Sequence, residues 1–143
     1  MTGQPFTYAC AGQRRTILLV EDEPFVREAT CSILESAGFE VLSAEDAASA
    51  LRAHEKRPSI DLVMTDMVLP GRTGQQLGQD LRQRSPELSV LVTSGYGNVE
   101  NETEDPAQRM YFLAKPYSRR SLIEKIESIF ATASLNRAAR QVS

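Results

Sequence analysis

Residues that could carry out chemistry lie directly after, or at the ends of, four short apolar segments of this 143-residue chain. In chain order they are two adjacent carboxylates, a single carboxylate, two adjacent hydroxyls and a lysine: Glu21 and Asp22, Asp66, Thr93 and Ser94, and Lys115. Three carboxylates held close together raise each other's pKa values unless a cation lies among them. Oxygen ligands without a nearby His or Cys cluster point to magnesium, with manganese or calcium as other candidates.

Magnesium usually keeps several waters and binds few carboxylates together with phosphate oxygens. The acidic residues therefore predict a phosphorylated partner, or phosphorylation of the site itself. A lysine ammonium can hold a carboxylate or a phosphoryl oxygen, and a hydroxyl can donate one further hydrogen bond. Carboxylate, metal ion, ammonium and hydroxyl together would form a cradle for an aspartyl phosphate, with Asp66 as the nucleophile.

The segments that carry these residues alternate between strand and helix patterns. Continuous apolar runs predict buried strands at 16–20, 40–44, 60–65, 88–93 and 111–114. Helical patterns run from Pro24 to the stop at Gly38, over 45–55, over 74–84 and from near 119 to 133. This alternation predicts an α/β fold with a parallel sheet covered on both faces. In such sheets ligands bind beyond the carboxyl ends of the strands, and the candidate residues converge at that edge.

Two segments have no buried face in their pattern. Residues 1–14 carry glycine, proline and polar residues, and we expect a flexible arm there. Residues 97–109 lie where a further helix should be, but they are almost wholly polar and contain Pro106. We expect a short, distorted or mobile helix in that position.

The composition is that of an ordinary soluble domain, with 41% hydrophobic and 24% charged residues. A net charge of −3 gives no basic field for nucleic acid, and no apolar run approaches the roughly 20 residues that span a membrane. The N-terminus lacks the pattern of a signal peptide. Cys10 and Cys31 show no metal-binding spacing, and we expect two reduced thiols in a cytoplasmic protein.

Each candidate residue also has a simpler explanation. Asp66 could form a turn, Glu21 and Glu23 could cap the helix that begins at Pro24, and a single lysine is most often solvated. His54 lies on a polar helix, and we expect it to be exposed, not a phosphorelay residue or a metal ligand. The functional interpretation is favoured by the combination of these residues. Without it, four separate simpler explanations would have to coincide at one edge of one sheet.

The ordered motifs ILLVEDE, DLVMTDMVLPGRTG, VLVTSGYG and FLAKPYS closely resemble the receiver domain of bacterial two-component response regulators. The resemblance covers roughly residues 15–133, which leaves 1–14 as an arm and 134–143 as a C-terminal tail. It implies a doubly wound, flavodoxin-like fold like that of the chemotaxis regulators, with five parallel strands in the order 2-1-3-4-5. The motifs SGYG and AKPYS also resemble those of receivers attached to hybrid histidine kinases.

The resemblance implies a role for each candidate acidic and basic position. Asp66 matches the phosphoacceptor, and Glu21 and Asp22 match the acidic pair that holds magnesium. With them, the backbone carbonyl of Val68 would complete the protein's share of the metal shell. Lys115 matches the family's lysine at the phosphorylation site. The implied protein is a phosphorylation-controlled switch and not an enzyme, apart from limited self-catalysed phosphotransfer and dephosphorylation.

The strand pattern alone does not choose between Thr93 and Ser94 as the switch hydroxyl. The resemblance selects Ser94, because the Gly95 that follows it matches the small residue beside the phosphate. Phe112 matches the aromatic residue that turns inward when the hydroxyl moves toward the phosphoryl group. Apolar Val68 and Tyr96 flank the acceptor and switch positions and predict slow hydrolysis of the phosphoaspartate.

The implied partner is a sensor histidine kinase or a histidine phosphotransfer protein, without direct nucleic-acid binding. The downstream partner and the oligomeric state are left open. One alternative is a degenerate receiver that serves as an interaction scaffold. Two others fit less well: a haloacid dehalogenase-type hydrolase would need an aspartate at position 68, and a nucleotide- or flavin-binding domain would need a phosphate loop where this chain has EDEP.

Overall fold

In the computed structural model of the chain, residues 14–95 and 104–142 are described. The predicted alternation of strands and helices is confirmed. The elements in chain order are β1 (Thr16–Val20), α1 (Pro24–Ser36), β2 (Glu40–Ala44), α2 (Ala47–Lys56), β3 (Leu62–Asp66), β4 (Val68–Leu69), β5 (Arg72–Thr73), α3 (Gly74–Arg84), β6 (Ser89–Ser94), a 3₁₀ helix (Pro106–Gln108), β7 (Met110–Ala114) and α4 (Arg119–Val142).

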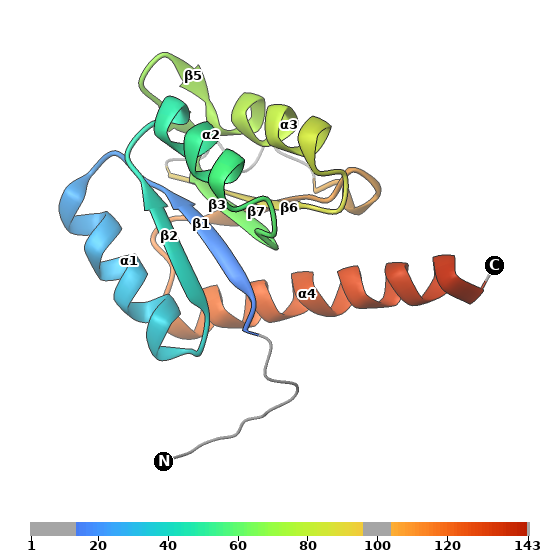
Figure 1. Cartoon of the computed structure of the whole chain (residues 1–143). Coiled ribbons are helices and arrows are strands. Elements are labelled where there is room, and N and C mark those ends of the chain that lie inside the picture. The colour runs from blue at the N-terminus through green and yellow to red at the C-terminus, as the bar shows by residue number, and fades with distance from the viewer. Residues whose placement is uncertain (1–13, 96–103, 143) are drawn as a thin grey trace.

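Five strands form one parallel sheet in the order β2-β1-β3-β6-β7 (Figure 1). Numbered along the chain as the five strands of this sheet, they have the predicted order 2-1-3-4-5. The chain crosses from one side of β1 to the other after β2, so the strand order reverses there. The carboxyl ends of β1 and β3 lie side by side beyond the pair Val20 and Thr65. This is where a doubly wound sheet binds its ligand.

Helices cover both faces of the sheet, with α1 and α4 on one face and α2 and α3 on the other (Figure 1). Alternate residues of the strands therefore enter two separate cores. The core under α1 and α4 includes Ile17, Leu34, Met64, Leu91, Leu122 and Ile126. The core under α2 and α3 includes Leu18, Val20, Ala50, Val63, Leu77 and Leu81.

Local sequence signals set the ends of the helices. Pro24 occupies the first turn of α1, where its missing N–H costs no hydrogen bond, and Gly38, at φ +99°, follows the end of the helix. Thr73 caps α3 through a reciprocal pair of hydrogen bonds with Gln76. The first residue of α3, Gly74, donates its N–H to the Met67 carbonyl at 2.7 Å. The start of α3 is thereby tied to the chain just after Asp66.

Two features differ from the predicted elements. The last helix continues to Val142, beyond the predicted end near residue 133. In the segment after Asp66, for which no element was predicted, β4 and β5 form a small antiparallel hairpin. Gly71 makes its turn with φ +83°, a backbone conformation that suits glycine.

The expectation that His54 is exposed was wrong. Its side chain is only 4% exposed on α2, and Nε2 lies 2.8 Å from the Ser85 hydroxyl just after α3. The polar sequence of α2 gave no sign of this contact because its partner lies 31 positions away along the chain. His54 therefore joins two helices on one face of the sheet.

Residues 96–103 lie outside the described part of the chain. Within the described residues of segment 97–109, the predicted short, distorted helix is present as a 3₁₀ helix at Pro106–Gln108. Residues 1–13 of the predicted arm 1–14, with Cys10, also lie outside the described residues. Within the described residues, Cys31 has no disulfide partner. Across the described ranges, we find no helix with the length and apolar character needed to cross a membrane.

Candidate functional site

Three carboxylates meet at the carboxyl edge of the sheet. Glu21 and Asp22 follow β1, and Asp66 ends the neighbouring strand β3. Each offers one oxygen, and these oxygens all lie within 4.8 Å of one another. Glu21 is buried and Asp22 is exposed, so the cluster opens to solvent on one side. The predicted convergence of the acidic pair with Asp66 is present.

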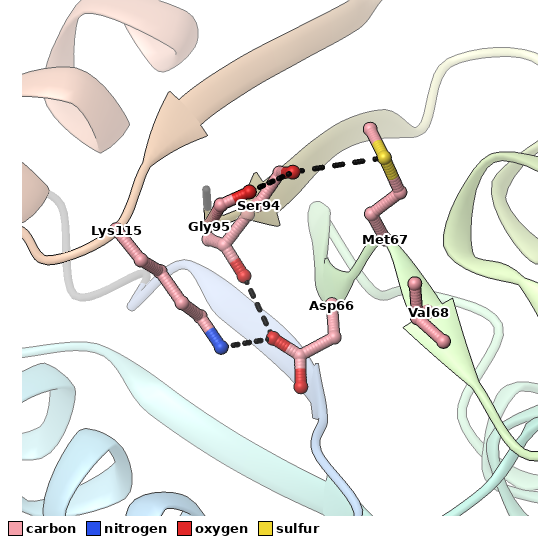
Figure 2. A pocket seen from close by; sticks show the side chains of 7 residues that line it. Asp66, Met67, Val68, Ser94, Gly95 and Lys115 are labelled. Carbon is pink, nitrogen blue, oxygen red and sulfur yellow. Dashed lines mark hydrogen bonds and ion pairs between the residues drawn. The ribbon is translucent and has the colours of Figure 1, made fainter. Parts of the chain in front are cut away.

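Lys115 extends from the end of β7 into the same cluster. Its Nζ lies 2.5 Å from Asp66 Oδ1 and 3.7 Å from Glu21 Oε1. Figure 2 shows the lysine side chain reaching across the pocket to the Asp66 carboxylate. The Lys115 N–H also donates to the Ser94 carbonyl at 2.7 Å, which fixes the lysine backbone relative to β6. The peptide bond from Lys115 to Pro116 is cis.

Charge and burial at this site act on the pKa values of two groups. Burial, together with a hydrogen bond to Asp66, raises the pKa of Glu21 to about 7. Burial alone would lower the pKa of Lys115, but its hydrogen bond and ion pair with Asp66 outweigh that effect and raise it. Lys115 is therefore charged at neutral pH, while Glu21 titrates near neutrality when no cation is bound.

Two hydroxyls lie beside Asp66 and have different contacts. Thr93 Oγ1 lies 3.0 Å from Asp66 Oδ1, whereas Ser94 Oγ lies 3.7 Å from Met67 Sδ and 3.5 Å from the Gly95 carbonyl (Figure 2). The register of β3 and β6 pairs Asp66 with Thr93, which places their side chains on the same face. The hydroxyl that contacts the carboxylate is therefore that of Thr93, whereas the resemblance selects Ser94 as the switch. Strand register is the signal that would have found it.

A small cavity of about 190 Å³ opens over the Asp66 carboxylate. Its walls are Asp66, Met67, Val68, Thr93, Ser94, Gly95 and Lys115 (Figure 2). The Val68 side chain stands exposed at this cavity. Tyr96, the other predicted flanking residue, lies outside the described residues. The space is large enough for a phosphoryl group.

Phe112, the aromatic residue predicted to turn inward on phosphorylation, lies on β7 and is buried, at 6% exposed. It packs in an apolar cluster with Val90, Val92 and Met110, against which Met67 also lies. On the outer edge of the sheet its backbone N–H donates a hydrogen bond to Glu104 Oε2 at 3.0 Å. Phe112 is therefore inward in this structure, and its movement on phosphorylation stays a prediction.

The donor set fits a hard divalent cation better than it fits helix capping. Glu23, the cap residue of α1, makes no side-chain capping hydrogen bond. Glu21 Oε2 does accept the Glu23 N–H at 3.1 Å, but its other oxygen faces Lys115. Three carboxylate oxygens lie close together here, and burial and Asp66 raise the pKa of Glu21. A bound divalent cation would offset the repulsion among these carboxylates.

Comparison with known proteins identifies a family. Residues 17–127 match the family described as response regulator receiver domain. The chain is 30% identical over 120 residues to the response regulator receiver protein CpdR of Brucella abortus, covering 83% of this chain and 99% of CpdR. It is 32% identical over 114 residues to the sensory transduction protein RegX3 of Mycolicibacterium smegmatis, covering 80% of this chain. The chain spans only 50% of RegX3, and 12% of the sensor kinase CckA of Brucella abortus, to which it is 33% identical.

Solved structures have the same fold. NtrX from Brucella abortus aligns with a TM-score of 0.82 and 33% identity, covering 92% of this chain and 30% of NtrX. A response regulator receiver domain protein from Clostridium thermocellum aligns with a TM-score of 0.75 and 25% identity, covering 87% of this chain and 98% of that one. The fold and the sequence pattern therefore point to one family.

Proposed function

Because this chain belongs to the receiver domain family of response regulators, we propose that Asp66 accepts a phosphoryl group and thereby switches the domain. One observation carries the proposal. The Asp66 carboxylate lies in one cluster with Glu21 and Asp22 and in direct contact with Lys115, although these residues come from three different strand ends. A carboxylate nucleophile beside a cation-binding cluster and an ammonium is the arrangement that phosphoryl transfer to aspartate requires.

We expect Glu21, Asp22 and Asp66, with the backbone carbonyl of Val68, to hold a magnesium ion, with manganese as a second candidate. When bound, the ion supplies neutralisation of the charge on the transferred phosphoryl group. The chain's own contribution is to place a positive charge beside these carboxylates and to orient the nucleophile. Lys115 performs both tasks, because its ammonium contacts Asp66 and faces Glu21.

The proposed reaction is transfer from a phosphohistidine. The P–N bond breaks, its electron pair returns to the imidazole, and an Asp66 carboxylate oxygen forms the new bond to phosphorus. The donor must reach Asp66 through the cavity that Lys115, Gly95 and Val68 border. The Lys115 ammonium then lies beside the incoming charge without having to move far, since it already contacts Asp66.

An exposed apolar surface near the site supports a protein as the phosphodonor. Phe25 is 83% exposed on the first turn of α1, and Val26 follows it. Both line a groove of about 800 Å³ that Lys115, Pro116 and Tyr117 complete. Contiguous exposed apolar surface of this kind marks sites of protein–protein contact. We propose that a sensor histidine kinase or histidine phosphotransfer protein in the cytoplasm docks there.

Ser94 is the proposed switch hydroxyl, and its backbone links the site to the edge of the sheet. Its side chain is buried and faces Met67, and its carbonyl accepts the Lys115 N–H. A movement of Ser94 toward a phosphoryl group would therefore displace the contact with Met67, which packs against the cluster that contains Phe112. The transmitted change is a repacking of this cluster, since Phe112 is already buried.

The proposal is tested by exposing the protein to a small phosphodonor with magnesium and measuring its intact mass. We expect a gain of one phosphoryl group in the wild type and none in Asp66→Asn. Asp80→Asn is a matched control, because Asp80 lies on α3 and pairs with Arg72 away from the cluster. Phosphorylation of Asp66→Asn at the wild-type level would overturn the assignment.

The same experiment separates the alternatives. A degenerate receiver that serves only as a scaffold would gain no phosphoryl group in any variant. A hydrolase would release phosphate continuously, and the Val68 position lacks the second aspartate that such an enzyme uses as acid and base. A nucleotide-binding domain would bind its ligand without covalent change.

A further inference from the structure

Thr93 contacts the phosphoacceptor although the predicted switch role belongs to its neighbour. Its side chain is 3% exposed at the end of β6, and its Oγ1 lies 3.0 Å from Asp66 Oδ1. The contact follows from strand register, because Asp66 and Thr93 are paired in the parallel sheet. A valine of nearly the same size would also fill this buried position, so packing alone does not require a hydroxyl there.

The single hydrogen of the Thr93 hydroxyl has two acceptors within reach. Asp66 Oδ1 is the nearer at 3.0 Å, and the Thr65 carbonyl lies at 3.5 Å. An ionised carboxylate is also the stronger acceptor, so the hydroxyl donates to Asp66. Lys115 Nζ donates to the same oxygen. Asp66 Oδ1 thus has two donors from the protein, and neither of these hydrogen bonds is made to Oδ2.

We propose that Thr93 is a positioning residue that directs the phosphoryl group to Oδ2 of Asp66 and shortens the lifetime of the phosphorylated state. This inference rests on the proposed function of Asp66 as phosphoacceptor. With Oδ1 held by Thr93 and Lys115, the carboxylate presents its other oxygen for bond formation. The hydroxyl then remains beside Oδ1 throughout the phosphorylation cycle.

The effect on lifetime follows from where the charge lies during hydrolysis. A water oxygen forms a bond to phosphorus and the P–Oδ2 bond breaks. The electron pair of that bond returns to the Asp66 carboxylate, and the water proton leaves with the phosphate or to solvent. In the acyl phosphate Oδ1 is a neutral carbonyl oxygen, whereas in the departing carboxylate it carries half of the negative charge.

The Thr93 hydrogen bond is therefore stronger in the transition state of hydrolysis than in the phosphorylated ground state. Phosphoryl transfer passes through a loose transition state, in which the bond to the leaving group is largely broken. Hydrogen bonds to a charged acceptor are about twice as strong as those to a neutral one, a difference of about tenfold in rate. Phosphorylation is affected less, because the free carboxylate is charged before the reaction and stays mostly charged in a loose transition state.

The test compares Thr93→Val with Thr93→Ser. Each protein is phosphorylated with a small phosphodonor in magnesium, the donor is removed, and the loss of the phosphoryl group is followed by intact mass. We expect Thr93→Val to lose the group about tenfold more slowly than the wild type, and Thr93→Ser to stay within about twofold of it. Thr16→Val is the matched control, because Thr16 is buried at the opposite end of the sheet and donates to Glu40.

The results separate the inference from the function on which it rests. Equal lifetimes for wild type and Thr93→Val would overturn the role of Thr93 and leave Asp66 as the acceptor. Equally slow loss in Thr93→Ser and Thr93→Val would also overturn it, because the threonine methyl and not the hydroxyl would then matter. Failure of the wild type itself to gain a phosphoryl group would overturn the proposed function. Should Thr93→Val fail to fold, Thr93→Ala replaces it in the same comparison.

Discussion

Replacing Gly74 by alanine should damage both the stability of the domain and its phosphorylation. Gly74 is the first residue of α3, and a Cβ placed there would lie 2.1 Å from the backbone oxygen of Asp66 and 2.9 Å from Thr65 Cγ2. The nearest atom belongs to the backbone, so it cannot rotate away as a side chain could. Either the end of β3 must move together with Asp66, or α3 must shift. A shift of α3 would disturb the hydrogen bond from the Gly74 N–H to Met67, the residue after Asp66.

The size of the effect can be worked from these contacts. Overpacking a buried site costs about 1 to 3 kcal/mol, and we take the upper value because a backbone oxygen obstructs the new atom. Alanine is favoured over glycine within a helix by at most about 1 kcal/mol. The free energy of unfolding should therefore fall by about 2 kcal/mol. With a urea dependence of about 2 kcal/mol/M, the unfolding midpoint falls by about 1 M.

Gly78→Ala is the matched control on the same helix. Its Cβ would meet the Val90 Cγ1 methyl at 2.7 Å, so it should also lower stability, but it does not touch Asp66. Urea unfolding and the initial rate of phosphorylation by a small phosphodonor are measured on both variants under folding conditions. We expect Gly74→Ala to slow phosphorylation about tenfold or more and Gly78→Ala to leave it within about twofold. A wild-type midpoint and rate in Gly74→Ala would refute this reasoning.

Three further predictions concern pH and water. Because burial and Asp66 raise the pKa of Glu21 to about 7, calorimetric magnesium affinity should rise between about pH 6 and 8 in the wild type but not in Glu21→Gln, and a flat wild-type profile would contradict this. Burial lowers the pKa of His54 from 6.5, so the folded protein favours the neutral imidazole. The free energy of unfolding should therefore keep its maximal contribution from His54 above pH 6.5 and fall below that pH, and it should fall less in His54→Gln. Urea unfolding that gives the same pH dependence for both proteins would exclude the effect. Val68→Asn should shorten the phosphoaspartate lifetime, and a wild-type half-life of seconds would count against an apolar shield at that position.

The positions of Glu21, Asp66 and Lys115 could be predicted from the sequence because a parallel sheet gathers strand ends at one edge. The location of each apolar run is sufficient for this prediction, because the ligand site of such a sheet lies at the carboxyl ends of its strands. The register of neighbouring strands is not needed for it, although register decides the finer contacts.

Thr93 and His54 show what the sequence could not supply. Which of the two adjacent hydroxyls contacts Asp66 depends on strand register, and register is set by packing across the whole sheet. His54 is buried beside Ser85, which follows α3, and the polar sequence around His54 does not indicate this contact. In the same way, the inward position of Phe112 depends on the apolar cluster of β6 and β7, whereas the motif gave only its residue type.

The central claim is that Asp66 carries the phosphoryl group. Borohydride reduces an aspartyl phosphate to homoserine, so treating the protein after reaction with a phosphodonor and magnesium marks the acceptor permanently. Peptide mapping by tandem mass spectrometry then locates the mark. We predict homoserine at position 66 in the wild type, and less of it when magnesium is removed. Homoserine at another aspartate, or none in a protein that is folded and supplied with magnesium, would contradict the proposed role of the site.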